Sequence, residues 1–216
     1  MKNSLIFSAS AGKKVFLIFL IIPFFFSCAH GPSAGGSAGT GPGKYKDWNG
    51  IDEVEIVQAF KVSSYSKIAV LPVDTSRTPL PDKSDGDYQP ITAVLAKADE
   101  IFLEGFKDGL KGAGGISSEP VKSADGLGGG VLLIRVKVAD MKPGSSALRV
   151  FVGYGAGRTL AKVEGEVVDA QNNNVVLRFT HARASSGAGS IGAERLMTND
   201  YRDVSKDVGK MLLKFQ

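Results

Sequence analysis

The sequence predicts an α+β fold, with a mixed sheet of four to five strands and two helices packed on one face of it. The sheet is expected to combine a strand-helix-strand unit with an antiparallel meander. Residues 90–110 and 197–215 place apolar side chains at three- and four-residue steps, which is the periodicity of an amphipathic helix. Short β-branched runs elsewhere are typical of strands. A chain of 216 residues suits one such domain with appendages.

The first half of the domain reads as a strand, a helix and a strand. Residues 66–73, SKIAVLPV, are apolar on both faces, as a central strand buried between two layers would be. Pro90 stands at a favourable helix start, and the amphipathic helix that follows ends at Gly112. We expect a short edge strand at residues 116–121 and a longer strand at residues 131–140. This order indicates a parallel pair with a right-handed crossover.

The second half reads as a meander followed by a helix. Residues 148–152, 160–169 and 174–180 are the expected strands, and a glycine-rich segment and a polar turn separate them. The last helix buries a stripe that ends at Phe215. The sheet face opposite the helices is expected to be solvated because it carries charged residues, namely Arg135, Lys137, Lys162, Glu164 and Glu166.

Residues 1–27 have the pattern of an export signal. Lys13 and Lys14 precede a twelve-residue apolar run, which is shorter than the roughly 20 residues of a membrane-spanning helix. The sequence Phe-Phe-Ser-Cys that ends at Cys28 resembles the lipobox of bacterial lipoproteins, although leucine and a small residue are commoner at its first two positions. The resemblance implies that Cys28 carries acyl chains such as palmitate. The alternatives are an ordinary cleaved signal with a chance cysteine, or an uncleaved anchor.

Residues 28–50 are predicted to be the lipidated cysteine and a flexible tether, and residues 51–216 a single periplasmic domain. The segment GPSAGGSAGTGPG at residues 31–43 cannot bury enough apolar surface to fold. A tether of this kind lets a lipid-anchored domain move. Ala29 stands where enteric-type lipoproteins of the inner membrane have aspartate, so the resemblance implies anchoring in the outer membrane.

The charge composition disfavours nucleic acid as a partner. The formal net charge is +4, but Lys2, Lys13 and Lys14 all belong to the predicted signal. Without them the chain has 23 basic and 22 acidic side chains, so a strongly basic surface is absent. The single cysteine excludes an intramolecular disulfide.

The glycine-rich segment at residues 153–157, GYGAG, has two interpretations. A dinucleotide site needs GxGxxG between a strand and a helix, whereas here the spacing is GxGxG and a strand follows. The glycines then serve a tight connection or bulge with positive φ. Alternatively, aromatic side chains beside bare backbone form an interaction surface for a partner or for the membrane, with the residues Phe151, Gly153, Tyr154, Gly155 and Gly157.

Patterns for catalysis and metal binding are sparse. His30 lies in the predicted tether, so a histidine-based enzyme would need His181 to converge with Asp169 or Ser185. No pair of histidines or cysteines has metal-ligand spacing, and the DKSDGD segment at residues 82–87 lacks the terminal glutamate of a calcium loop. The sequence therefore predicts a protein that is not an enzyme and has no metal and no cofactor.

The segments VGYGAG at residues 152–157 and VVDAQNN at residues 167–173 carry a family resemblance. They resemble uncharacterised bacterial lipoprotein families, catalogued as domains of unknown function, with a VG(F/Y)GAG motif followed by a strand and a D-A-x-(T/N)-(G/N) turn. The likeness spans residues 64–215 and implies an envelope location without any catalytic residue. We expect a non-enzymatic protein that docks to another envelope component. The alternative is a small-ligand or lipid-binding domain, with the ligand between residues 74–90 and the sheet.

Overall fold

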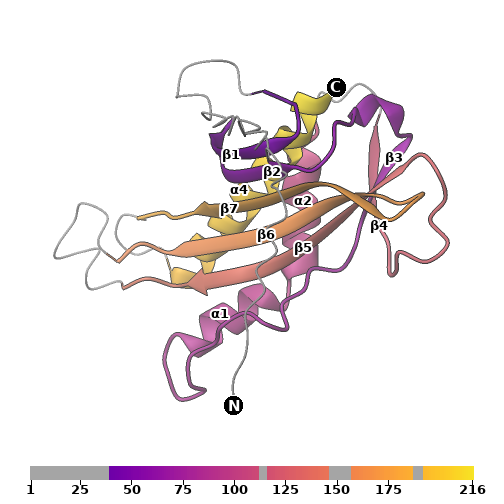
Figure 1. Cartoon of the computed structure of the whole chain (residues 1–216). Helices are drawn as coiled ribbons and strands as arrows, with labels where there is room; N and C mark the ends of the chain where they lie inside the picture. The colour runs from indigo at the N-terminus through magenta and orange to yellow at the C-terminus, as the bar shows by residue number, and fades with distance from the viewer. Residues whose placement is uncertain (1–38, 112–115, 146–156, 187–191) are drawn as a thin grey trace, which may run out of the picture. The chain divides into compact units, whose positions relative to one another are not determined.

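The computed structural model describes residues 39–111, 116–145, 157–186 and 192–216. This part of the chain forms one mixed seven-stranded sheet in the order β1-β2-β7-β6-β5-β3-β4 (Figure 1). The strands are β1 Gly43–Trp48, β2 Ile51–Ile56, β3 Lys67–Val70, β4 Ser117–Pro120, β5 Val131–Lys142, β6 Leu160–Asp169 and β7 Asn174–Arg183. The α-helices are α1 Tyr88–Leu95, α2 Ala98–Gly109 and α4 Ala193–Leu212, and two short 3-10 turns lie at Val62–Ser64 and Leu213–Phe215.

The α+β class and the mixed sheet are confirmed. Strand β3 pairs in parallel with both β4 and β5, as the strand-helix-strand pattern predicts, and the short edge strand is β4. Strands β5, β6 and β7 form the antiparallel meander. The predicted strand at residues 148–152 lies outside the described residues. The predicted number of four to five strands is wrong, because the sheet has seven.

The two strands that sequence reasoning missed form the hairpin β1–β2. Trp48 pairs with Ile51 across the two-residue turn Asn49-Gly50. Both turn residues have positive φ, 49° and 86°, which is the geometry of a type I′ hairpin turn. Strand β1 lies within residues 28–50, the range predicted as tether, so the sheet begins before the expected domain boundary at residue 51.

The helices lie together on one face of the sheet (Figure 1), and the described residues form three α-helices where two were predicted. The predicted helix from Pro90 is divided into α1 and α2 by a turn at Ala96 and Lys97, where Lys97 leaves helical geometry with φ −113° and ψ 15°. Helix α4 contacts β2, β6 and β7, and α2 packs on α4. No helix in the described ranges is both long and apolar enough to cross a bilayer.

Apolar side chains form two clusters. The larger cluster fills the space between the helices and the sheet, where the stripe of α4 is buried as predicted. The smaller one lies on the opposite sheet face, where the connection from β4 to β5 covers Ala69, Val131, Leu133 and Val168. Only the remaining part of that face is charged and open to solvent, so the expectation of a solvated face holds for part of it.

Candidate functional site

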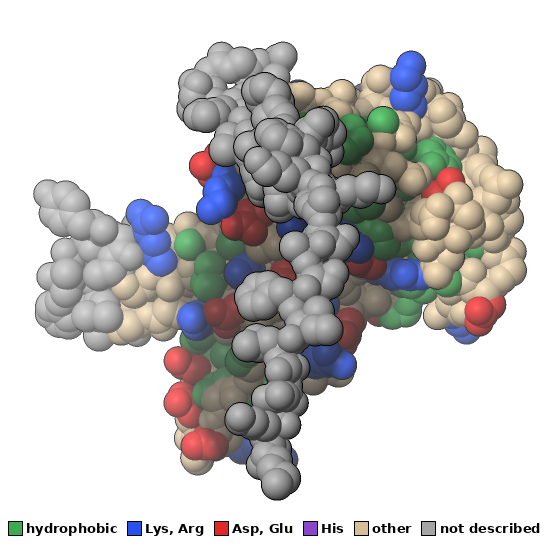
Figure 2. Space-filling view, in the orientation of Figure 1, with side chains coloured by type: hydrophobic (Ala, Val, Ile, Leu, Met, Phe, Trp, Pro, Cys, Tyr) green, Lys and Arg blue, Asp and Glu red, His purple; other side chains and the backbone are tan. Residues whose placement is uncertain are grey.

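Two rows of side chains cross the open part of the sheet, on the face turned away from α2 and α4. The strand registers place the first row side by side on β1, β2, β7, β6 and β5, as Lys44, Glu55, Arg178, Glu166 and Arg135. The second row, on the same five strands, is Lys46, Glu53, Thr180, Glu164 and Lys137. Charge alternates along the whole first row. Figure 2 shows basic and acidic side chains interspersed over this face.

Arg178 is the centre of the first row. Its Nε donates to Glu166 Oε1 at 3.0 Å, and its Nη1 donates to Glu55 Oε2 at 3.2 Å. The hydrogen bond from Arg178 is the largest of the effects that lower the pKa of Glu55. Ion pairs between such exposed groups contribute little to stability. The two rows are therefore of interest as a surface with a regular pattern of charge, rather than as a source of stability.

The open face is hollowed by a depression of about 810 Å³. This volume lies within the range of small-molecule sites, roughly 300–1,000 Å³. Leu71, Pro72 and Asp74, at the start of the β3–α1 connection, also line it. Basic and acidic groups balance in the lining, which has Lys44, Lys46, Arg135, Lys137 and Arg178 against Glu53, Glu55, Asp74, Glu164 and Glu166. The depression therefore suits a neutral or zwitterionic ligand better than a polyanion.

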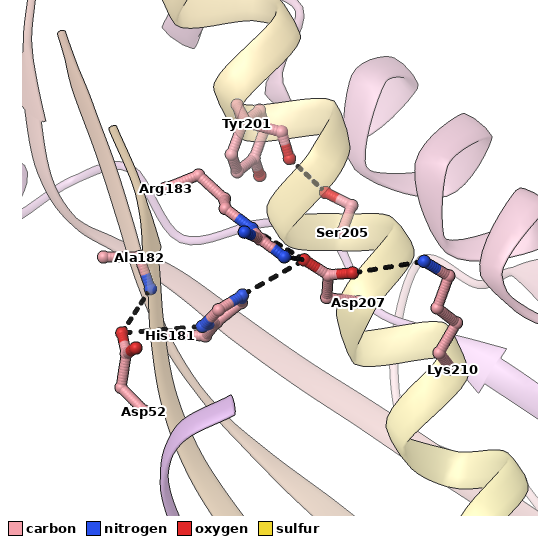
Figure 3. A network of polar contacts seen from close by, with 8 residues as sticks. All are labelled: Asp52, His181, Ala182, Arg183, Tyr201, Ser205, Asp207 and Lys210. Atoms are coloured by element: carbon pink, nitrogen blue, oxygen red, sulfur yellow. Dashed lines mark hydrogen bonds and ion pairs between the residues drawn. The ribbon is translucent and has the colours of Figure 1, made fainter. Parts of the chain in front are cut away.

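His181 lies on the helix side of β7 in a network of polar groups (Figure 3). Its side chain is buried, with Nε2 at 3.3 Å from Asp207 Oδ2 and Nδ1 at 3.5 Å from Asp52 Oδ2. Arg183 donates to Asp207, and the Ala182 main-chain N–H donates to Asp52 at 2.8 Å. The network joins β2, β7 and α4.

The partners that an enzyme based on His181 would require lie elsewhere. Asp169 accepts hydrogen bonds from the Tyr65 hydroxyl and from the Gln171 main-chain N–H. Ser185 contacts Thr159 and Asp200. Because the buried His181 side chain lies between the Asp207 carboxylate of α4 and the half-exposed Asp52 carboxylate of β2, the geometry indicates a structural role in joining the helix to the sheet.

The Asp207 carboxylate should make the fold sensitive to acid. Burial acts to raise the pKa of Asp207, but hydrogen bonds from Arg183 and His181 outweigh it and hold that pKa below its usual range. A carboxyl group with a lowered pKa in the folded state stabilises the fold above its unfolded-state pKa. That contribution is lost as the pH falls through the folded-state pKa.

We therefore expect the melting temperature of Asp207→Asn to fall less steeply than that of the wild type between neutral pH and about pH 3. Thermal unfolding followed by circular dichroism over this range measures the difference. Asp203→Asn is the matched control, because Asp203 is an exposed residue of the same helix. Parallel pH profiles for Asp207→Asn and the wild type would contradict the assignment.

A second polar cluster lies where two connections leave the sheet. The Asp200 carboxylate of α4 is buried and accepts hydrogen bonds from the Thr159 hydroxyl and, at 3.3 Å, from the Ser185 main-chain N–H. Thr159 N–H donates to Ser185 O at 3.0 Å. On the other side of the β5–β6 connection, Ser145 N–H donates to Gly157 O at 3.2 Å. We call Ser145, Gly157, Thr159, Ser185 and Asp200 the loop base.

Of the residues that the sequence assigns to lipidation or to the interaction surface, the structure describes only Gly157. Gly157 has φ 69°, the positive value expected of a glycine in a tight connection, and its carbonyl oxygen lies close to Gly144. The others lie outside the described residues: Cys28, Phe151, Gly153, Tyr154 and Gly155. Sequence reasoning missed the β1 and β2 members of the charged rows, which the Asn49-Gly50 turn signal would have revealed. It also missed Thr159 and Asp200, for which no local pattern exists.

Comparison with known proteins gives a family match over part of the chain. Residues 89–189 match a family described as a domain of unknown function, DUF4410. The matched range includes the VGYGAG segment and the turn after β6. None of the curated proteins matches this chain.

Several solved structures match this chain at low sequence identity. A PelC dodecamer from Paraburkholderia phytofirmans is 15% identical, with a TM-score of 0.45 over 74% of this chain and 94% of that chain. Protein XCC0632 from Xanthomonas campestris is 10% identical, with a TM-score of 0.41 over 69% and 84%. Lipoprotein GNA1162 from Neisseria meningitidis is 14% identical, with a TM-score of 0.34 over 58% and 88%.

Proposed function

We propose that this chain is a non-enzymatic lipoprotein, anchored in the outer membrane through acylated Cys28, whose periplasmic domain docks to another envelope component. In this proposal residues 1–27 are removed as a signal, and the contact surface includes Phe151 and Tyr154 with Gly153, Gly155 and Gly157. The partner is an envelope protein rather than a nucleic acid, because the chain without its signal is almost neutral.

The loop base is the observation that supports this contact surface. A buried carboxylate costs free energy unless hydrogen bonds satisfy it, and the partners of Asp200 belong to the connections themselves. Thr159 and Gly157 thereby fix the position at which residues 146–156 rejoin the sheet. Fixing the ends of a binding segment lowers the entropy lost when it meets a partner.

The test is photo-crosslinking in cells from position 154 of the full-length lipoprotein. Tyr154 is replaced by a photoreactive amino acid, and mass spectrometry identifies both the adduct and the N-terminal peptide. We expect a discrete protein adduct together with triacylated Cys28. Leu80, whose side chain is 47% exposed and lies on the β3–α1 connection, is the control position and should give no discrete adduct.

Two results would contradict the proposal in different ways. A correctly lipidated protein without an adduct from position 154 would remove the docking surface and leave the glycines with their conformational role alone. An unmodified Cys28 would remove the anchor, whatever the crosslinking result.

The second candidate function is binding of a small ligand or lipid, and the depression on the open face favours it. Its lining includes Leu71 and Asp74, at the start of the connection that the sequence proposes as one wall of a ligand site. Native mass spectrometry of the full-length chain purified in mild detergent tests this function. A bound molecule that Arg178→Ala releases would support it, and a protein that carries no adduct would contradict it.

A further inference from the structure

Strand β1 forms one edge of the sheet and presents two lysines on the open face. It pairs only with β2 in the part of the chain that the structure describes. Edge strands carry main-chain N–H and C=O groups that another strand can pair with. Lys44 contacts Glu55 at 3.4 Å, but its side chain is 81% exposed. Lys46 is exposed and makes no ion pair with any carboxylate of the described residues.

The acidic residues nearest to these lysines across the strands are Glu55 and Glu53 of β2, and the ranges outside the described residues supply no other. All 22 aspartates and glutamates lie within the described ranges, and residues 1–38, 112–115, 146–156 and 187–191 contain none. The alternation of charge across the first row therefore ends in a positive charge at β1. A continuation of that alternation requires carboxylates from another molecule.

We propose that the edge of β1 binds an extended acidic segment of a partner protein by strand addition. Alternate residues of a strand share one face, so a strand added beside β1 would place two residues, two positions apart, next to Lys44 and Lys46. Opposite charges in adjacent positions across strands stabilise the pairing. Main-chain hydrogen bonds supply the affinity, and the two lysines select carboxylates at alternating positions.

Charge also disfavours the other occupants of this edge. If β1 paired with β1 of a second copy, the lysines of the two strands would face one another, and like charges weaken such pairing. A polyanion such as nucleic acid would meet Glu53 and Glu55 on the neighbouring strand. A short acidic strand added at the edge would lie next to β1, so its carboxylates would be closer to Lys44 and Lys46 than to Glu53 and Glu55.

The test is binding of labelled peptides to the full-length chain in detergent, measured by fluorescence anisotropy. In the acidic peptide glutamate alternates with valine, and in its counterpart lysine replaces glutamate. We expect the wild type to bind the acidic peptide, and Lys44→Glu with Lys46→Glu to weaken that binding about tenfold or more while strengthening binding of the lysine peptide. Lys83→Glu with Lys122→Glu makes the same charge change at two exposed loop positions and should have no effect.

Further probes separate strand addition from simple attraction. Methylation of alternate peptide nitrogens blocks main-chain pairing and should abolish binding. Equal binding of the methylated peptide, or no loss on charge reversal, would overturn the proposal. The proposal would also be overturned if vesicles of phosphatidylglycerol bound to the chain through Lys44 and Lys46 while the acidic peptide did not bind. The double variant Lys44→Gln with Lys46→Gln removes the two positive charges without introducing negative ones. It should still weaken binding of the acidic peptide if the charge-reversal variant disturbs the fold.

This site is independent of the proposed docking segment. β1 is separated from β6, which follows residues 146–156, by β2 and β7. A negative crosslinking result from position 154 would therefore leave the β1 edge untouched, and failure of peptide binding would leave the docking segment untouched.

Discussion

Replacing Gly109 by alanine should destabilise the domain by about 3 kcal/mol. A Cβ atom at Gly109 would lie 2.1 Å from Lys206 O and 2.9 Å from the Cα of Gly209, both main-chain atoms of α4. Main-chain atoms of a packed helix cannot move aside as the end of a side chain can, so α2 and α4 would have to separate. Helix propensity alone predicts the opposite sign, because alanine is favoured over glycine in a helix by about 1 kcal/mol.

Urea unfolding followed by circular dichroism measures this change. Gly209→Ala tests the same contact from α4, where a Cβ would lie 2.5 Å from Phe106 O. Gly128→Ala is the control, because no atom lies within 4 Å of a Cβ at that position. A Gly109→Ala protein as stable as the wild type would show that the two helices are not in close contact there.

The close approach of α2 and α4 illustrates what the sequence does not encode locally. The three- and four-residue spacing of apolar residues showed which face of each helix is buried, and the structure confirms it for both helices. The same spacing carries no information about the distance between the helices. Gly105, Gly109 and Gly209 acquire their meaning only when the two helices are placed together.

Strands were predictable where alternation was long and uninterrupted. The predicted strand at residues 160–169 coincides with β6, and the prediction at residues 131–140 falls within β5. The hairpin β1–β2 was missed because it follows a glycine-rich segment whose composition points to a tether. The Asn49-Gly50 turn between two alternating stretches was the available signal.

The candidate sites depended on information that only the fold supplies. Lys44 and Arg178 belong to one row because β2 connects them through its register. Thr159 reaches Asp200 across 41 positions of sequence. Long-range register and packing determine both relationships, so the sequence showed which residues were charged but not which charges were neighbours.

Replacing Trp48 by alanine should destabilise the domain by about 3–4 kcal/mol. Trp48 is only 1% exposed and stacks on Phe215, with the ring centroids 5.2 Å apart. Phe60 also stacks on Phe215, with the ring centroids 4.6 Å apart. Truncation removes this contact, leaves a cavity beside the end of α4 and removes the hydrogen bond from Trp48 Nε1 to Gly39 O.

This prediction distinguishes the observed boundary of the domain from the one that composition suggests. If residues 43–50 belonged to a flexible tether, Trp48→Ala would leave the free energy of unfolding unchanged. Because Trp48 is the only tryptophan, unfolding of the variant is followed by circular dichroism rather than by fluorescence. A double-mutant cycle with Phe215→Ala should give a coupling of about 1 kcal/mol for the stacked pair. Additive effects would instead mean that the two rings are buried separately.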